Sequence, residues 1–89
     1  MEAEMTFRTA EKITVREEED DCFTLYHDEQ AFETNAVGVE IITICREPHT
    51  LSSLCEELST RFDVEPEILR DDVNALIPDL IACNLIEVI

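Results

Sequence analysis

The stretch FTLYHDEQAFETN, residues 23–35, contains two strand-forming runs, a polar turn and a helix cap. Apolar and polar side chains alternate over residues 22–27, and the residue types at 23–26 all favour a strand. The polar residues 27–30 make a short turn, after which residues 31–34 continue as another strand. So short a connection predicts antiparallel pairing. Asn35 is a good N-cap, so a helix should begin directly after the second strand.

A further strand is predicted upstream of this stretch. Ile13 and Val15 share one face of an extended chain, as a half-buried strand requires. The five acidic residues 17–21 then separate this strand from the next. Adjacent carboxylates could in principle hold a cation, but on a turn we interpret them as a solvated loop.

Residues 1–12 lack periodicity. We interpret them as a flexible N-terminal tail, with a weak first strand as the alternative. The folded domain would then span residues 13–89, and a chain of this length supports one core.

Downstream, three helices are predicted. The first begins at Asn35 and ends before Pro48, because proline excludes helical geometry from its predecessor. Thr50 caps the second helix, and Pro66 suits the first position of the third, with Glu65 as its cap. Their apolar positions recur at helical spacing: Val37, Ile41, Ile42 and Ile44; then Leu51, Leu54, Cys55, Leu58 and Phe62; then Leu69, Val73, Leu76, Ile77 and Leu80.

The third helix contains Pro78, which removes a backbone hydrogen bond and clashes with the preceding turn. We expect a kink there, with a stop and restart as the alternative. Asn84 can adopt the left-handed conformation that ends a helix, which leaves residues 85–89 for a last extended segment. The fold class is therefore α+β, a three-stranded antiparallel sheet followed by three helices in a winged helix-turn-helix arrangement.

Charge excludes several partners. Twenty-two acidic residues against six basic ones give a formal net charge of −16. Nucleic acids and anionic membranes attract Lys and Arg, so both are poor partners for this chain. Residues 65–80, where a DNA-reading helix would lie, contain one arginine, Arg70, among five acids. The near absence of lysine, with Lys12 alone, is also loosely compatible with a high-salt cytoplasm.

No sequence feature indicates a metal, a cofactor or catalysis. Cys22, Cys45, Cys55 and Cys83 are widely separated, and we interpret them as reduced, small apolar residues. His27, Asp28 and Cys22 could be imagined as a catalytic group, but one strand and turn offers them no pocket. We expect a non-enzymatic protein. The N-terminus has no signal-peptide pattern and no apolar run reaches about 20 residues, so we expect a cytoplasmic protein.

Several segments, in this order and spacing, resemble the PqqD-like family. They are residues 32–35 (FETN), 50–54 (TLSSL), 62–67 (FDVEPE), 73–80 (VNALIPDL) and 84–87 (NLIE). The resemblance covers residues 13–89. Two positions depart from the family pattern: Pro78 is not expected inside the third helix, and Asn84 stands where glycine is expected.

The resemblance implies a non-catalytic domain of a pathway that modifies ribosomally made peptides. Such a domain binds the leader segment of a precursor peptide and presents it to a modifying enzyme, such as a radical SAM enzyme, a cyclase or a leader peptidase. The leader adds as a strand to the last strand of the sheet, beside the third helix. The implied peptide-binding residues are Ala31, Phe32, Glu33, Thr34, Leu69, Asp72, Val73 and Leu76.

Three alternatives remain at this stage. Phe32, Leu69, Val73 and Leu76 could belong to the core instead. The exposed strand edge could pair with a second copy, giving a homodimer. The fold could also serve a general protein-interaction or regulatory role without a leader peptide. If a leader does bind, the net charge predicts that it carries Lys or Arg near the groove.

Overall fold

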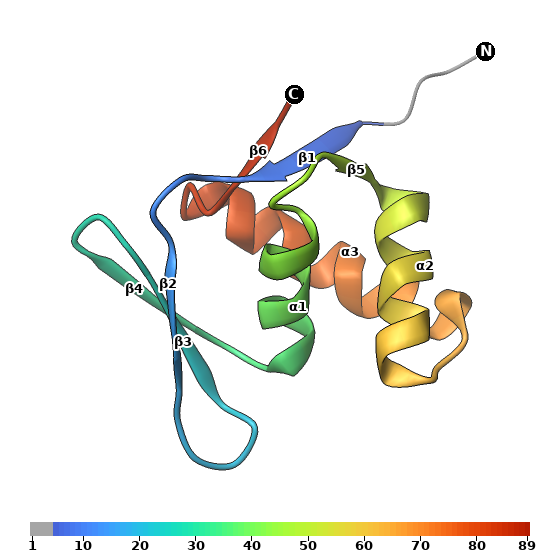
Figure 1. Cartoon of the computed structure of the whole chain (residues 1–89), viewed down its shortest axis with the longest axis horizontal. Coiled ribbons are helices and arrows are strands. Elements are labelled where there is room, and N and C mark those ends of the chain that lie inside the picture. Colours follow the sequence, from blue (N-terminus) through green and yellow to red (C-terminus); the bar gives the residue numbers. More distant parts are fainter. Residues whose placement is uncertain (1–4) are drawn as a thin grey trace.

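The computed structural model describes residues 5–89. These residues form two small sheets and three helices. Figure 1 shows the helices between and beside the sheets. In chain order the elements are β1 to β4, α1, β5, α2, α3 and β6.

The first sheet is the predicted meander. It consists of β2 (Thr14–Glu17), β3 (Phe23–His27) and β4 (Gln30–Thr34), in the order β2-β3-β4 with antiparallel pairing throughout. Leu25, on the central strand, is fully buried. Between β3 and β4, Asp28 takes a left-handed φ of 55°, which closes the tight turn. All three strands lie where the alternation predicted them.

The second sheet was not predicted. It consists of β5 (His49–Thr50), β1 (Thr6–Thr9) and β6 (Ile86–Val88), in the order β5-β1-β6. β1 pairs with both neighbours in antiparallel fashion, with Phe7 opposite His49 on one side and Val88 on the other. The tail predicted for residues 1–12 is therefore wrong for Thr6–Thr9, where the alternative of a first strand is correct. The physical reason is that Phe7 is buried in the core. Residues 1–4 of that prediction lie outside the described part.

The helices are α1 (Ala36–Ile44), α2 (Leu51–Phe62) and α3 (Pro66–Ala82). The first two caps form as predicted. The Asn35 side-chain oxygen accepts from the Gly38 N–H at 3.1 Å, and the Thr50 hydroxyl oxygen accepts from the Ser53 N–H at 3.2 Å. Glu65 precedes α3 without a side-chain capping bond.

Pro78 lies inside α3, which continues from Pro66 to Ala82 without a break. The alternative of a stop and restart is therefore wrong. Asn84 has the left-handed φ of 60° expected after the helix end. The chain then enters β6, as the predicted extended segment required.

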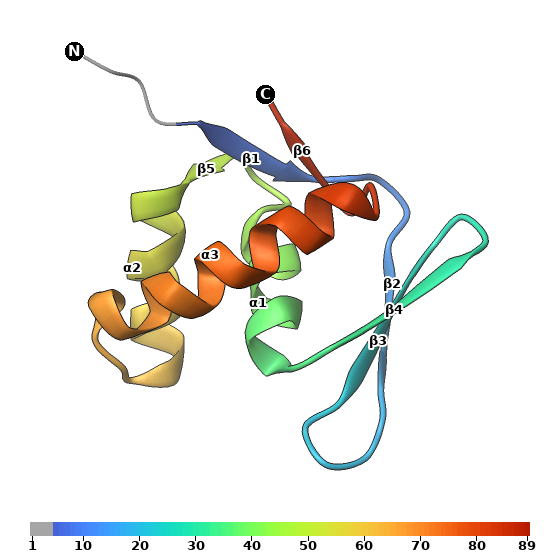
Figure 2. The ribbon, with the colours of Figure 1, turned by 180° about the vertical axis from the view of Figure 1, so that it is seen from behind.

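The core lies between the helices and both sheets. Seen from behind in Figure 2, α3 crosses α1 and α2, and it packs against both as well as against β6. Fully buried residues from every layer meet there, among them Leu25, Ile41, Ile42, Leu54, Leu58, Val73, Leu80 and Leu85. The helical and strand periodicities in the sequence thus converge on one core.

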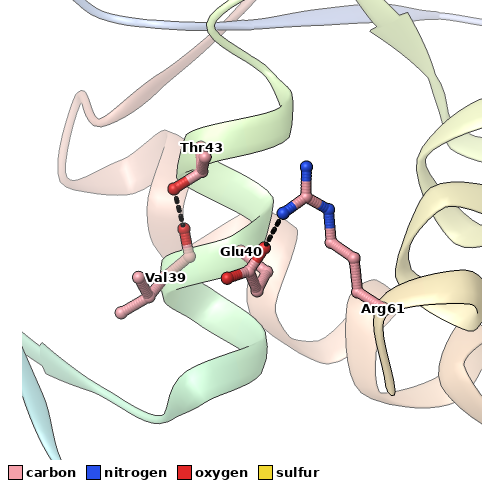
Figure 3. A network of polar contacts seen from close by, with 4 residues as sticks. All are labelled: Val39, Glu40, Thr43 and Arg61. Carbon is pink, nitrogen blue, oxygen red and sulfur yellow. Dashed lines mark hydrogen bonds and ion pairs between the residues drawn. The ribbon is translucent and has the colours of Figure 1, made fainter. Parts of the chain in front are cut away.

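An ion pair joins α1 to α2 at the surface (Figure 3). Arg61 Nη1 lies 2.8 Å from Glu40 Oε2. One turn further along α1, the Thr43 hydroxyl donates to the Val39 carbonyl at 3.0 Å. The side chains of Arg61 and Glu40 are 45% and 28% exposed, so we expect their ion pair to contribute less than about 1 kcal/mol to stability.

Candidate functional site

β4 forms one edge of the first sheet, and its register determines which backbone groups are free. Only Asp28 and Glu29 separate the paired residues His27 and Gln30, so that pair must exchange both of its backbone hydrogen bonds. Bonded and non-bonded pairs alternate along an antiparallel ladder. Gln30, Phe32 and Thr34 therefore bond to β3, whereas Ala31 and Glu33 direct their N–H and C=O groups away from it.

These outward groups are available for pairing. Among the backbone bonds between described residues, none outside the strand ladders uses Ala31 or Glu33. The side chains of both residues are exposed. The free edge of β4 thus offers two donors and two acceptors spaced for one more strand.

The other side chains of β4 turn inward. Phe32 is half-buried and packs against the core, and Thr34 is half-buried at the approach to α1. Residues at the start of the strand face a shallow depression against the exit of α3. Its lining comes from both segments: Leu25, His27, Gln30, Ala31 and Phe32 with Cys83 and Leu85. Residues 31–34 of β4, which were predicted to contact the peptide, therefore have an apolar inner side and a polar outer side.

His27 stands beside this depression. Its side chain is 16% exposed, and Nε2 lies 3.6 Å from Asp28 Oδ2. Nδ1 is buried without a hydrogen-bond partner among the described residues. The neighbouring Asn84 closes a second shallow depression with the turn 27–30.

The four residues predicted on α3 separate into two kinds. Leu69 and Val73 are buried, at 4% and 0% exposure, and belong to the core. Leu76 is half-buried, and Asp72 is exposed. The core alternative is therefore correct for Leu69 and Val73, because the same helix face must cover α1 and α2. Of the four, Leu76 and Asp72 keep accessible surface.

Sequence reasoning missed a mainly apolar hollow on the surface. It has a volume of about 540 Å³ and lies between β1, the start of α2 and the later turns of α3. Its walls are Met5, Phe7, Leu51, Asn74, Ile77, Pro78 and Ile81. From the sequence, Leu51 and Ile77 were identified only as members of apolar helix stripes and Pro78 only as an exception within the third helix. The hollow could not be predicted because it depends on β1 docking beside α3.

Metal binding and thiol chemistry depend on how the histidines, acids and cysteines of the described residues are arranged. Within residues 5–89, no group of three His, Cys, Asp or Glu side chains is placed to hold a metal ion. All four cysteines are free thiols, and burial raises the pKa of the Cys45 thiol to about 11. A thiol held protonated in this way is a poor nucleophile. In the same described part, none of the helices combines the length and the apolar character needed to span a bilayer.

The sequence model of one protein family matches residues 22–86. That family is PqqD, described as coenzyme PQQ synthesis protein D. The chain belongs to the PqqD family. The PqqD match begins just before β3 and ends within β6, so it includes β4 and α3 but not β1 or β2. A search of curated protein sequences found no match.

A solved structure supports the PqqD fold over almost the whole chain. It is the solution NMR structure of the PqqD truncation of Methylobacterium extorquens PqqCD, described as a functional and stand-alone recognition element for ribosomally synthesized and post-translationally modified peptides. The TM-score is 0.72 at 19% sequence identity, covering 92% of this chain and 88% of that one. The two proteins therefore share the PqqD fold, the α+β winged helix-turn-helix arrangement predicted from the sequence.

Proposed function

We propose that this PqqD-family chain is a non-catalytic carrier of a ribosomally made precursor peptide. The leader segment of the peptide adds as a strand to β4, and the domain presents the peptide to a modifying enzyme. Radical SAM enzymes, cyclases and leader peptidases are the candidate enzymes. The observation that carries the proposal is the free edge of β4, where Ala31 and Glu33 direct unpaired backbone groups outward.

Three further features support this proposal. Main-chain pairing gives a bound strand its affinity, while alternate side-chain positions give specificity. The inner side of β4 has the half-buried Phe32 and the adjoining depression, and the outer side has the exposed Glu33. The resemblance of the fold to a protein described as a recognition element agrees with the same role. On α3, Leu76 and Asp72 keep accessible surface and are the candidates for contact with the peptide, whereas Leu69 and Val73 are buried.

The test is an NMR titration of the isotope-labelled protein with synthetic leader segments of precursor peptides encoded beside its gene. We expect backbone amide shifts concentrated at residues 31–34 and at accessible positions of α3. A general interaction domain would give no shifts with any of these leaders. A homodimer through β4 would give shifts on dilution of the protein alone.

A proline substitution tests the strand addition itself. Ala31→Pro removes an outward N–H without removing a bond to β3, so the sheet should persist while peptide affinity falls about tenfold. Glu17→Pro is the matched control. Glu17 lies on β2 opposite Phe23, and its N–H points to the other free edge of the same sheet. Equal losses of affinity in the two variants would contradict binding at β4.

A further inference from the structure

Given the proposed function, we propose that β4 selects a peptide by a two-residue pattern. A lysine or arginine of the peptide faces Glu33, and the adjacent residue, which faces Phe32, is apolar. The substrate class is therefore an extended peptide in which basic and apolar side chains alternate at the point of contact.

The pattern follows from the register of the sheet. An antiparallel strand added to β4 forms hydrogen-bonded pairs with Ala31 and Glu33, because those residues have the free backbone groups. The peptide residue between these pairs lies opposite Phe32, as a non-bonded pair whose side chains come closer together. Successive peptide side chains thus alternate between the outer and inner sides of the sheet.

On the outer side, one row of residues runs across all three strands. Arg16 on β2 lies opposite Thr24 on β3, and Thr24 lies opposite Glu33 on β4. The cation of this row is already engaged, because Arg16 Nε lies 3.4 Å from Glu18 Oε1. Glu18 also accepts from the Thr24 hydroxyl at 3.5 Å.

Glu33 is consequently left without a counter-charge. No ion pair or side-chain hydrogen bond joins it to another described residue. The next position in the row would be occupied by the peptide. Opposite charges directly across a strand pair are favourable and like charges are unfavourable, so a basic residue fits this position and an acidic one does not.

On the inner side, the peptide residue opposite Phe32 meets apolar groups. The depression beside β4 has a volume of only about 10 Å³, so a peptide side chain would lie over it and not inside it. Its lining is Leu25, Phe32, Cys83 and Leu85 together with His27, Gln30 and Ala31. A charged side chain there would lose water against a lining that is mostly apolar. An aliphatic side chain of the peptide would instead extend the core that Phe32 already joins.

The test uses synthetic peptides of about ten residues that alternate Thr and Val and carry one variable outward position, Lys, Ser or Glu. Affinity is measured by NMR titration at physiological salt on the whole protein. We expect the Lys peptide to bind about fivefold more tightly than the Glu peptide. In Glu33→Lys this order should reverse, and in Glu33→Gln it should largely disappear.

Glu57→Lys is the matched control. Glu57 is an exposed acid on α2, and its replacement changes the net charge by the same amount as Glu33→Lys. If Glu33→Lys and Glu57→Lys keep the same Lys preference, the selectivity comes from the overall charge and the pattern is overturned; amide shifts at residues 31–34 then still identify β4 as the binding edge. If no peptide shifts the amides of residues 31–34, the proposed function fails together with the pattern. Amide dispersion in Glu33→Gln verifies that the sheet is intact.

Discussion

The Thr9 hydroxyl donates to the Ile42 carbonyl at 2.7 Å, in the interior of the protein. This bond connects β1 to the last turn of α1 across 33 positions of sequence. The Thr9 N–H also donates, at 2.7 Å, to the carbonyl of Cys45, the C-cap of the helix. Carbonyls in the last turn of a helix lack donors within the helix. Here Thr9 of β1 donates to two carbonyls at the end of α1, those of Ile42 and Cys45.

Replacing this hydroxyl tests how firmly β1 belongs to the fold. The Arg46 N–H is directed to Thr43 and not to Ile42, so Thr9→Val leaves the buried Ile42 carbonyl without its partner. We expect a loss of about 1–3 kcal/mol in the free energy of unfolding, measured by denaturant titration. Thr43→Val removes an exposed hydroxyl from the same helix and should change stability by less than about 0.5 kcal/mol. Equal effects would mean that β1 contributes little.

Gly38 is expected to resist replacement by alanine. A Cβ atom at this position would lie 2.9 Å from Thr34 Cβ and 3.0 Å from Thr34 Cγ2, closer than such atoms pack. Gly38→Ala should therefore destabilise the protein by about 1–3 kcal/mol, although alanine is favoured in helices by about 1 kcal/mol. The double variant with Thr34→Ala should recover about half of the loss, because it removes the crowding side chain. If Gly38→Ala were more stable than the wild type, α1 and β4 would have to move apart at this point at little cost in free energy.

Cys45 should make stability depend on pH at alkaline values. Burial raises its pKa from 9.0 to about 11, so the folded protein keeps the thiol proton where the unfolded chain releases it. The stability from this group is complete below pH 9 and is lost as pH rises toward 11, by on the order of 2 kcal/mol. Denaturant unfolding at several pH values should show a steeper decline for the wild type than for Cys45→Ala. Parallel declines would contradict a buried thiol.

Added salt should stabilise the protein. With 22 acidic residues against six basic ones, repulsion between carboxylates opposes compaction, and salt screens it. We expect the Tm to rise by about 5 °C between low salt and 1 M NaCl, if screening contributes about 1 kcal/mol. A variant with Glu19→Gln and Asp21→Asn in the acidic turn should show a smaller rise. A falling Tm would instead indicate that ion pairs such as Arg8–Glu87 and Glu40–Arg61 dominate.

Local signals predicted most of the elements. The alternation around Leu25, the caps at Asn35 and Thr50 and the left-handed Asn84 all act within a few residues, and each lies where it was expected. The candidate site was predicted less completely. Residues 31–34 do form an edge strand, but Leu69 and Val73 proved to be core. The apolar residues of a helix face have the same spacing in the sequence whether the face covers a neighbouring helix or lines a groove.

The sequence alone determines the meander, the starts and ends of the helices and the acidic character of the surface. The turn and the caps form between residues that are close in sequence, and the net charge depends on composition and not on the fold. The second sheet and the apolar hollow at Pro78 were decided by tertiary structure. β1 pairs with residues more than 40 positions away, and no local pattern in so short a strand records its partners. The free edge of β4 is likewise a feature of the tertiary structure, in which β1 and β6 pair with each other in the second sheet and no strand lies beyond β4 in the first.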